Sequence, residues 1–304
     1  MLYIRSLREG LPVFKALGSS TRVAIMELLI EKGPMRMTAI AQQLGITGGA
    51  LTSHVKELTD AGLIYIETTG GKHGLQKICH AYDRRILVEA APMGLEQQIY
   101  QHDLPVGGFA HSDVTGASGL ARREGPLEPQ NSPEAFASSD RERAGLVWFS
   151  EGSLVYRLAT PLEKGDKALE LNISLELASF APDSTGKTGA DVTLAINDTP
   201  VATWAVALGR TGDRNPHGWW QPGWPQHGHL CLISINSEGT YVDGKRVSAV
   251  KATNLALEEG DIRIAVSSKP RGRRSGGLMI FGRDFGHHEQ DINTLLKYRH
   301  GKQK

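Results

Sequence analysis

The stretch that most constrains the fold runs from Ile46 to Leu63 and reads ITGGALTSHVKELTDAGL. Thr47 carries a hydroxyl that can cap a helix N-terminus. Three apolar residues follow at helical spacing and predict a helix anchored to a core on one side: Leu51, Val55 and Leu58. The opposite side is small, polar or basic, which suits a helix that enters a groove of duplex DNA, and it consists of Gly48, Gly49, Thr52, Ser53 and Lys56.

Short helical segments precede this stretch and a hairpin follows it. Helices are predicted over residues 11–17, 21–32 and 37–44, with Gly45 in the turn before the fourth helix. IYIET and LQKICHA then read as two strands around the Gly-rich tip TTGGKHG. Thr69, Lys72 and His73 at this tip are expected near DNA phosphates, because Lys supplies charge and Gly lets the backbone come close. The alternative is a solvated hairpin without a role.

Residues 10–92 resemble the ArsR-type winged helix-turn-helix repressors. FKALGSSTRVAIMELL is similar to the opening of that family, with Arg22 at its Arg position. ITGGALTSHVKELTDAGLI matches the family's recognition-helix pattern at Thr47, Thr52, His54, Val55, Leu58, Ala61, Gly62 and Leu63. The resemblance implies a homodimer that places two recognition helices on a near-palindromic double-stranded DNA operator. It also implies that His54 approaches the DNA backbone, although a lone helical His is more often packed against a neighbour.

No metal or cofactor is expected. The helix before the predicted recognition helix reads TAIAQQLG and lacks the Cys-x-Cys motif of the metal-sensing members of the family. Cys79 and His80 are adjacent in a predicted strand, so their side chains point to opposite faces. A core Cys and a surface His are therefore favoured over a metal site that includes His73.

The segment from about Asp83 is interpreted as a further helix. It carries more apolar residues than a small head can cover: Ile86, Leu87, Ala90, Met93, Leu95 and Ile99. Together with the first helix it is expected to form the dimer surface, as it does in the family. The alternative is that it packs on the C-terminal domain, and both can hold.

The remaining chain predicts a connector and an all-β domain. Residues 105–144 are rich in Gly, Pro, Ser and charge without periodicity, which indicates a linker, although residues 105–121 can also lie extended against a sheet. Short alternating segments over 145–287 predict a β-sandwich of jelly-roll type, with a tight turn at Asn197-Asp198. Residues 288–304 are expected to form an amphipathic helix and tail. The predicted fold class is thus multidomain α+β, with a winged helix-turn-helix over 1–104 and a C-terminal sandwich.

The loop from Gly209 to Gly228 holds three of the five Trp residues of the chain. Exposed Trp rings stack on sugars while neighbouring polar side chains bind the hydroxyls. The candidate effector site is Arg210, Asp213, Arg214, Asn215, His217, Trp219, Trp220 and Trp224. The equally weighted alternative is that the Trp residues plug one end of the sandwich. The whole arrangement resembles predicted bacterial regulators that join an ArsR-type head to a jelly-roll domain, and the stretches that carry this resemblance are SLELASFAP, AINDTPVATW, NPHGWWQ, GTYVDGKRVS and GGLMIFGRDFG.

These features favour a DNA-binding repressor controlled by a small effector, with a carbohydrate as the favoured class. The net charge is only +1, but residues 1–92 carry 11 basic against 8 acidic residues, an excess of 3 on the proposed head. With no signal-peptide core, no apolar run that can span a bilayer and only two cysteines, a cytoplasmic protein without membrane contact is expected. A protein-interaction module is the alternative. A glycosidase is disfavoured, because it needs two carboxylates and the loop offers only Asp213.

Overall fold

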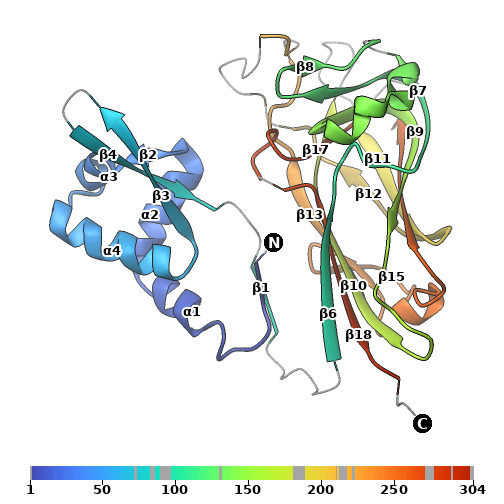
Figure 1. The fold of residues 1–304 in the computed structure, drawn as a ribbon, viewed down its shortest axis with the longest axis horizontal. Coiled ribbons are helices and arrows are strands. Elements are labelled where there is room, and N and C mark those ends of the chain that lie inside the picture. The colour runs from blue at the N-terminus through green and yellow to red at the C-terminus, as the bar shows by residue number, and fades with distance from the viewer. Residues whose placement is uncertain are drawn as a thin grey trace. The chain divides into compact units, whose positions relative to one another are not determined.

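The computed structural model divides the chain into two compact units, Met1–Gly94 and Leu95–Lys304, each with its own core (Figure 1). It describes residues 2–71, 74–82, 86–89, 97–129, 132–180, 189–209, 211, 218–220, 223–270, 277–288 and 290–301. Among these residues, no helix has both the length and the apolar character needed to cross a membrane.

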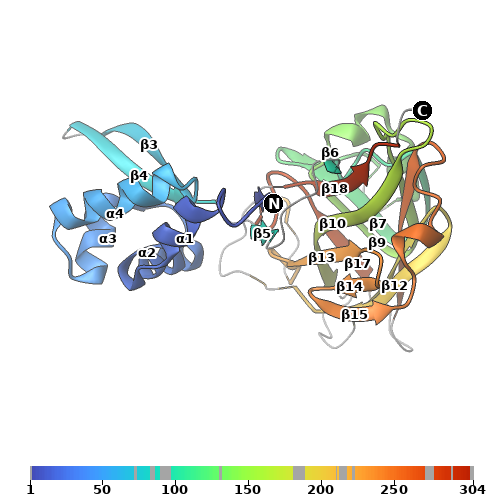
Figure 2. The ribbon, with the colours of Figure 1, turned by 90° about the horizontal axis from the view of Figure 1, so that it is seen from below.

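The first unit is a small α+β domain in which four helices lie on one side of a β-hairpin (Figure 2). Its elements are β1 (Leu2–Ile4), α1 (Leu11–Leu17), α2 (Ser20–Lys32), β2 (Met35–Arg36), α3 (Met37–Leu44), α4 (Gly48–Asp60), β3 (Ile64–Gly71), β4 (Gly74–Ala81) and β5 (Ile86–Val88). Strand β2 joins the hairpin as a third strand in the order β2-β4-β3. The four helices and the hairpin predicted from the sequence are confirmed; the two-residue strand β2 is an addition.

The recognition-like helix α4 begins and packs as its sequence predicts. Thr47 is the N-cap, and its hydroxyl accepts a hydrogen bond from the Ala50 amide at 3.2 Å. Leu51, Val55 and Leu58 are buried in the unit's core. Gly45 has a left-handed conformation with φ of 65°, which turns the chain sharply between α3 and α4 and favours glycine. Arg22 donates hydrogen bonds to the carbonyls of Lys15 and Ala16, so it ties the start of α2 to the end of α1.

The predicted helix from Asp83 is wrong. Residues 86–88 form the strand β5, which pairs in parallel with β1, and residues 97–104 form the strand β6 (Gln97–Leu104) of the second unit. Ile86 and Leu87 therefore belong to one sheet and Ile99 to another, while Ala90, Met93 and Leu95 lie outside the described residues. Pairing with strands far away in the sequence, β1 and β18 (Ile292–Arg299), overrode the local helical pattern.

The second unit is all-β apart from three short 3-10 helices among its described residues. Its further strands are β7 (His111–Arg122), β8 (Gly125–Pro126), β9 (Leu146–Leu158), β10 (Lys167–Phe180), β11 (Ala190–Ile196), β12 (Thr199–Val206), β13 (His229–Ile235), β14 (Thr240–Val242), β15 (Lys245–Ser248), β16 (Ile262–Pro270) and β17 (Gly277–Phe281). The 3-10 helices are η1 (Pro133–Ala137), η2 (Ser139–Arg143) and η3 (Ala252–Asn254). The predicted strands over 145–287 are confirmed, as is the tight turn at Asn197-Asp198, where φ is 45° and 65°.

Two long strands, β9 and β10, organise this unit. At one end β17 lies between them and pairs with both. At the other end they separate, so that β9 continues with β16 and β10 with β18. The sheet thereby divides into two layers, and the main apolar core lies between them, with residues from β9, β11 and β16 on one side and from β10, β13 and β18 on the other.

The segment 105–144 is not a linker. Strand β7 pairs along most of β9, and η1 packs against β7. The glycines that make this segment look flexible are required by close packing: a Cβ on Gly119 would overlap the Trp148 indole, and one on Gly107 would overlap the Arg141 carbonyl. Composition alone does not distinguish glycines of this kind from those of a flexible linker.

The predicted C-terminal helix is also wrong. Residues 292–299 form β18, which lies between β10 and β6 in the sheet. Ile292 to Leu296 are all buried, so this strand lacks the alternation of a half-exposed strand. Its buried polar side chains bond to β6: Asn293 donates to the Asp103 carboxylate, and Thr294 donates to the His102 carbonyl at 2.8 Å.

Candidate nucleic-acid interface and the Trp-rich loop

The outer face of α4 is exposed and carries little side-chain bulk. Thr47, Gly48, Gly49, Thr52, Ser53 and Lys56 are all exposed, and His54 is half-buried. The Thr52 hydroxyl donates to the Gly48 carbonyl at 2.8 Å and so stays close to the helix. The face therefore presents backbone, small side chains and the charge of Lys56 to its surroundings.

Gly48 and Gly49 have no internal reason to be glycine. Each adopts a helical conformation in the first turn, and a Cβ built on either would meet nothing within 4 Å. Glycine at such a position weakens a helix relative to alanine. Thr47 caps the amide of Ala50, and the Gly48 and Gly49 amides belong to the first turn, whose N–H groups have no acceptor within the helix. The bare start of α4 therefore fits close approach by an external surface that carries hydrogen-bond acceptors.

The β3–β4 hairpin adds a second exposed basic position. Thr68 pairs with Lys77 and Thr69 pairs with Gln76 across the hairpin, and Lys77 is exposed whereas Thr69 is half-buried. The sequence does not predict this exposure, because Lys77 is two positions from buried Cys79 and the period-2 pattern places both side chains on the same face of the strand. Lys72 and His73 lie outside the described residues.

Cys79 and His80 have separate environments, as the strand geometry predicts. Cys79 is fully buried in the core, and burial raises the pKa of its thiol, against the opposing effect of the Lys77 charge. His80 stacks on Tyr65 with ring centroids 4.5 Å apart, and its Nε2 lies 2.9 Å from a Glu67 carboxylate oxygen. The contacts of His80 therefore stabilise the hairpin, and the side chains of Cys79 and His80 do not converge on one site.

The Trp-rich loop of the second unit packs its rings into a second apolar cluster. Trp220 and Trp224 are 5% and 8% exposed, respectively, whereas Trp219 is half-buried. Trp224 meets Trp148 of β9 edge to face at 4.9 Å, and Trp220 stacks on Phe285 at 6.0 Å. The Trp220 indole N–H donates to the Trp224 carbonyl at 3.3 Å. These rings cover the face of β17 that is turned away from the main core, where Met279 and Phe281 are buried.

The described part of this loop thus shows the arrangement of a plug. Stacking on a sugar needs an accessible ring face, which two of the three Trp residues lack. The polar members of the candidate effector site, Arg210, Asp213, Arg214, Asn215 and His217, lie outside the described residues. The structure brings Trp219, Trp220 and Trp224 together, with Trp219 at 5.4 Å from Trp220.

The three solved structures described next are distant likenesses of this chain. A lectin from Bauhinia forficata in complex with GalNAc is 11% identical, with a TM-score of 0.29, over 66% of this chain and 98% of the lectin. A family GH115 4-O-methyl-alpha-glucuronidase is 10% identical, with a TM-score of 0.29, over 71% of this chain and 19% of that enzyme. The insecticidal delta-endotoxin Cry8Ea1 from Bacillus thuringiensis is 10% identical, with a TM-score of 0.28, over 79% of this chain and 30% of the toxin. Likenesses this weak say nothing about the function of the chain.

Comparison with family models identifies the first unit. No curated protein matches the chain. The model described as "Winged helix-turn-helix DNA-binding" matches residues 19–65, which span α2 to the start of β3 and include the whole exposed face of α4. The match agrees with the helix order, the capped and core-anchored α4, and the hairpin that follows it and pairs with β2. The N-terminal unit is therefore a winged helix-turn-helix DNA-binding domain, joined in one chain to a large all-β domain.

Proposed function

We propose that the protein is a homodimeric transcriptional repressor of the cytoplasm that binds a double-stranded DNA operator through α4 and the β3–β4 hairpin. The observation that carries this proposal is the exposed face of α4, where two glycines border empty space and Lys56 is the cation. Small side chains let the helix backbone come close to the base edges, which lie deeper in the groove than the phosphates. The resemblance to ArsR-type heads supports the same docking.

In the proposed complex, α4 enters the major groove with its first turn toward the DNA. The amides of Gly48 and Gly49 bind a phosphate, as helix N-termini do. Thr52, Ser53 and His54 contact the backbone and base edges, and Lys56 binds a second phosphate. Lys77, with Thr69, Lys72 and His73 of the hairpin, follows the adjacent phosphates as a wing. Because this face lacks Arg, Asn and Gln, sequence readout rests on shape and methyl contacts.

Replacing Lys56 or Lys77 by Ala is expected to weaken DNA binding and to flatten its salt dependence. Each lost phosphate contact lowers the slope of log K against log[salt] by about 1. Fluorescence anisotropy with a labelled duplex from upstream of the coding region, titrated over a series of salt concentrations, measures both quantities. Lys245→Ala, at an exposed position on β15, is the matched control and leaves the slope unchanged. An unchanged slope for both head variants would show that DNA docks elsewhere.

The homodimer is supported by an apolar patch at the start of the first unit. Leu7, Leu11 and Phe14 are 52%, 48% and 38% exposed. Pairing two such patches would remove them from water. Because residues 86–88 and 97–104 are strands instead of parts of the expected helix, α1 and the turn before it are the part of the predicted dimer surface that remains.

Leu11→Glu is expected to convert the dimer to a monomer, since the new carboxylate would be buried without a partner. Size-exclusion chromatography with light scattering gives the mass directly. Val247→Glu, at a 42% exposed position on β15, is the matched control and leaves the dimer intact. A dimeric Leu11→Glu protein would place the interface on another surface.

We propose that the all-β domain is of jelly-roll type and binds the effector, a carbohydrate, at the Trp-rich loop. Support comes from its separate core and from Trp219, which is only half-buried and belongs to the same loop as the polar candidate residues. Trp220 and Trp224 anchor this site instead of contacting the sugar. An effector that binds the DNA-free conformation more tightly releases the operator by the difference in binding free energy. In this role the domain binds the effector without catalysing a reaction.

A further inference from the structure

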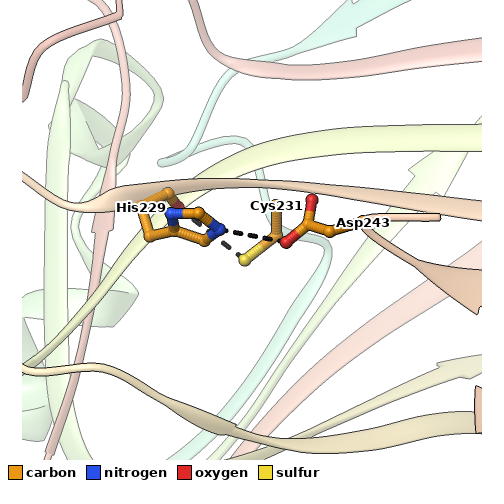
Figure 3. A group of neighbouring side chains, drawn as sticks. All are labelled: His229, Cys231 and Asp243. Carbon is orange, nitrogen blue, oxygen red and sulfur yellow. Dashed lines mark hydrogen bonds and ion pairs between the residues drawn. The ribbon is translucent and has the colours of Figure 1, made fainter. Parts of the chain in front are cut away.

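Three side chains with different metal-binding atoms converge at one end of strand β13 (Figure 3). They are His229, Cys231 and Asp243, and one ligand atom from each lies within 4.8 Å of the other two. The His229 Nε2 atom is 3.0 Å from Oδ2 of Asp243. The sequence shows no motif here, because the third residue comes from beyond the next strand.

The backbone explains why these residues meet. His229 and Cys231 are two positions apart on β13, so both side chains leave the same face of the strand. Asp243 lies in the two-residue turn between β14 and β15, where its φ of 50° and that of 78° at Gly244 form a tight hairpin. Its Oδ1 atom accepts the Leu232 amide at 3.0 Å, and this contact orients Oδ2 toward His229.

We propose that His229, Cys231 and Asp243 bind a divalent transition-metal ion, with Zn²⁺ as the preferred ion. Imidazole nitrogen, thiolate sulfur and carboxylate oxygen are the three donor types of protein zinc sites. Zinc bonds of about 2.0–2.3 Å set ligand atoms about 3–4 Å apart in a tetrahedron, close to the spacing in this cluster. Water or another ligand takes the fourth position, since the His229 and Asp243 side chains are 60% and 29% exposed.

The burial of the three ligands matches this role. Cys231 is 2% exposed and forms the inner wall of the site, while His229 and Asp243 open it to solvent. The Cys231 thiol donates a weak hydrogen bond to the His229 carbonyl, with 3.7 Å between the sulfur and the oxygen. On binding, the ion replaces the thiol proton, which passes to solvent, so that one proton is released per ion bound at a pH below the thiol's pKa.

A nucleophilic Cys-His-Asp site fits the geometry less well. In that arrangement the two ring nitrogens of the His face different partners, one the nucleophile and the other the acid that orients the ring. Here the Asp243 carboxylate contacts Nε2, and the Cys231 sulfur lies on the same side of the His229 ring (Figure 3). Convergence of all three groups on one point is the arrangement of metal ligands.

The experiment uses the full chain, stripped with a chelator and titrated with Zn²⁺ by calorimetry and with Co²⁺ by optical absorption. We expect one site per chain, a proton release that varies with the buffer, and a thiolate-to-Co²⁺ charge-transfer band. His229→Gln and Asp243→Asn are each expected to weaken binding by more than the roughly 10–100-fold that loss of an outer-sphere partner costs. Asn also tolerates the left-handed conformation of the turn, so the fold is retained.

Two further variants assign the sulfur. Cys231→Ser is expected to abolish the charge-transfer band, whereas Cys79→Ser, at the buried thiol of the other unit, leaves it intact. His111→Gln, at an exposed histidine on β7, is the control for His229→Gln and binds Zn²⁺ as the parent does. If Zn²⁺ binding is absent, or survives both His229→Gln and Asp243→Asn, the proposed site is wrong. Because the readouts need no DNA, their failure leaves the proposed repressor function untouched.

Discussion

Gly49→Glu is expected to stabilise the first unit while abolishing DNA binding. Space around this glycine is open, and the residue lies in the first turn of α4. Removing a helical glycine and placing an acid near the positive end of the helix together add about 1 kcal/mol to the free energy of unfolding. On DNA the same carboxylate faces phosphates, and like charges in contact cost several kcal/mol, so affinity falls at least about 100-fold.

Stability is expected to rise while DNA affinity falls, and a general loss of folding cannot produce this combination. Chemical denaturation followed by helical circular dichroism gives the stability, and anisotropy with the upstream duplex at low salt gives the affinity. Ser20→Glu places the same charge in the first turn of α2, also at an exposed position, and is the matched control. Equal losses of affinity for Gly49→Glu and Ser20→Glu would mean that general charge, not the α4 face, governs binding.

Trp220→Ala is expected to destabilise the all-β domain by about 3–5 kcal/mol, the usual cost of deleting a buried aromatic ring. Its ring is 5% exposed, stacks on Phe285 and meets Trp224 edge to face at 5.9 Å. The main-chain carbonyl of Trp224 would also lose its indole donor. All five Trp residues of the chain lie in Leu95–Lys304, so Trp fluorescence during urea unfolding reports on this domain alone.

Trp219→Ala is the matched variant, since Trp219 belongs to the same loop but is only half-buried. Its effect on unfolding is expected to be clearly smaller than that of Trp220→Ala, and it is expected to remove the response of DNA binding to sugars. If Trp220→Ala unfolds at the parent's urea concentration, the ring is not an anchor, and an exposed stacking role regains support. If Trp219→Ala keeps a sugar response, the effector binds elsewhere.

The winged helix unit could be predicted from the sequence because its signals are local. A capping Thr47, apolar residues at helical spacing and a glycine with a left-handed conformation act within a few residues of one another. The β3–β4 hairpin likewise joins neighbouring segments. The exposure of Thr52, Ser53 and Lys56 followed from the helical periodicity, whereas that of Lys77 did not, because Lys77 shares a strand face with buried Cys79.

The edges of the all-β domain could not be predicted, because their partners lie far away in the sequence. Residues 97–104 and 292–299 each carry apolar residues at spacings that also suit a helix, and they become strands by pairing with each other. Residues 111–122 resemble a linker in composition, but they pair with β9, and Gly119 is required because a side chain there would overlap the Trp148 indole. Long-range pairing thus decided between two structures that the local pattern left open.

By itself, the sequence determined that a DNA-binding head precedes a β-rich body, since periodicity and caps are properties of short segments. Only the tertiary structure decided where the side chains of Trp220, Trp224 and Cys231 lie. Burial of Trp220 and Trp224 depends on the face of β17 that they cover, and the meeting of Cys231 with Asp243 depends on how β13 and β14 pair. Both are consequences of contacts between distant residues, and these form only when the whole sheet is assembled.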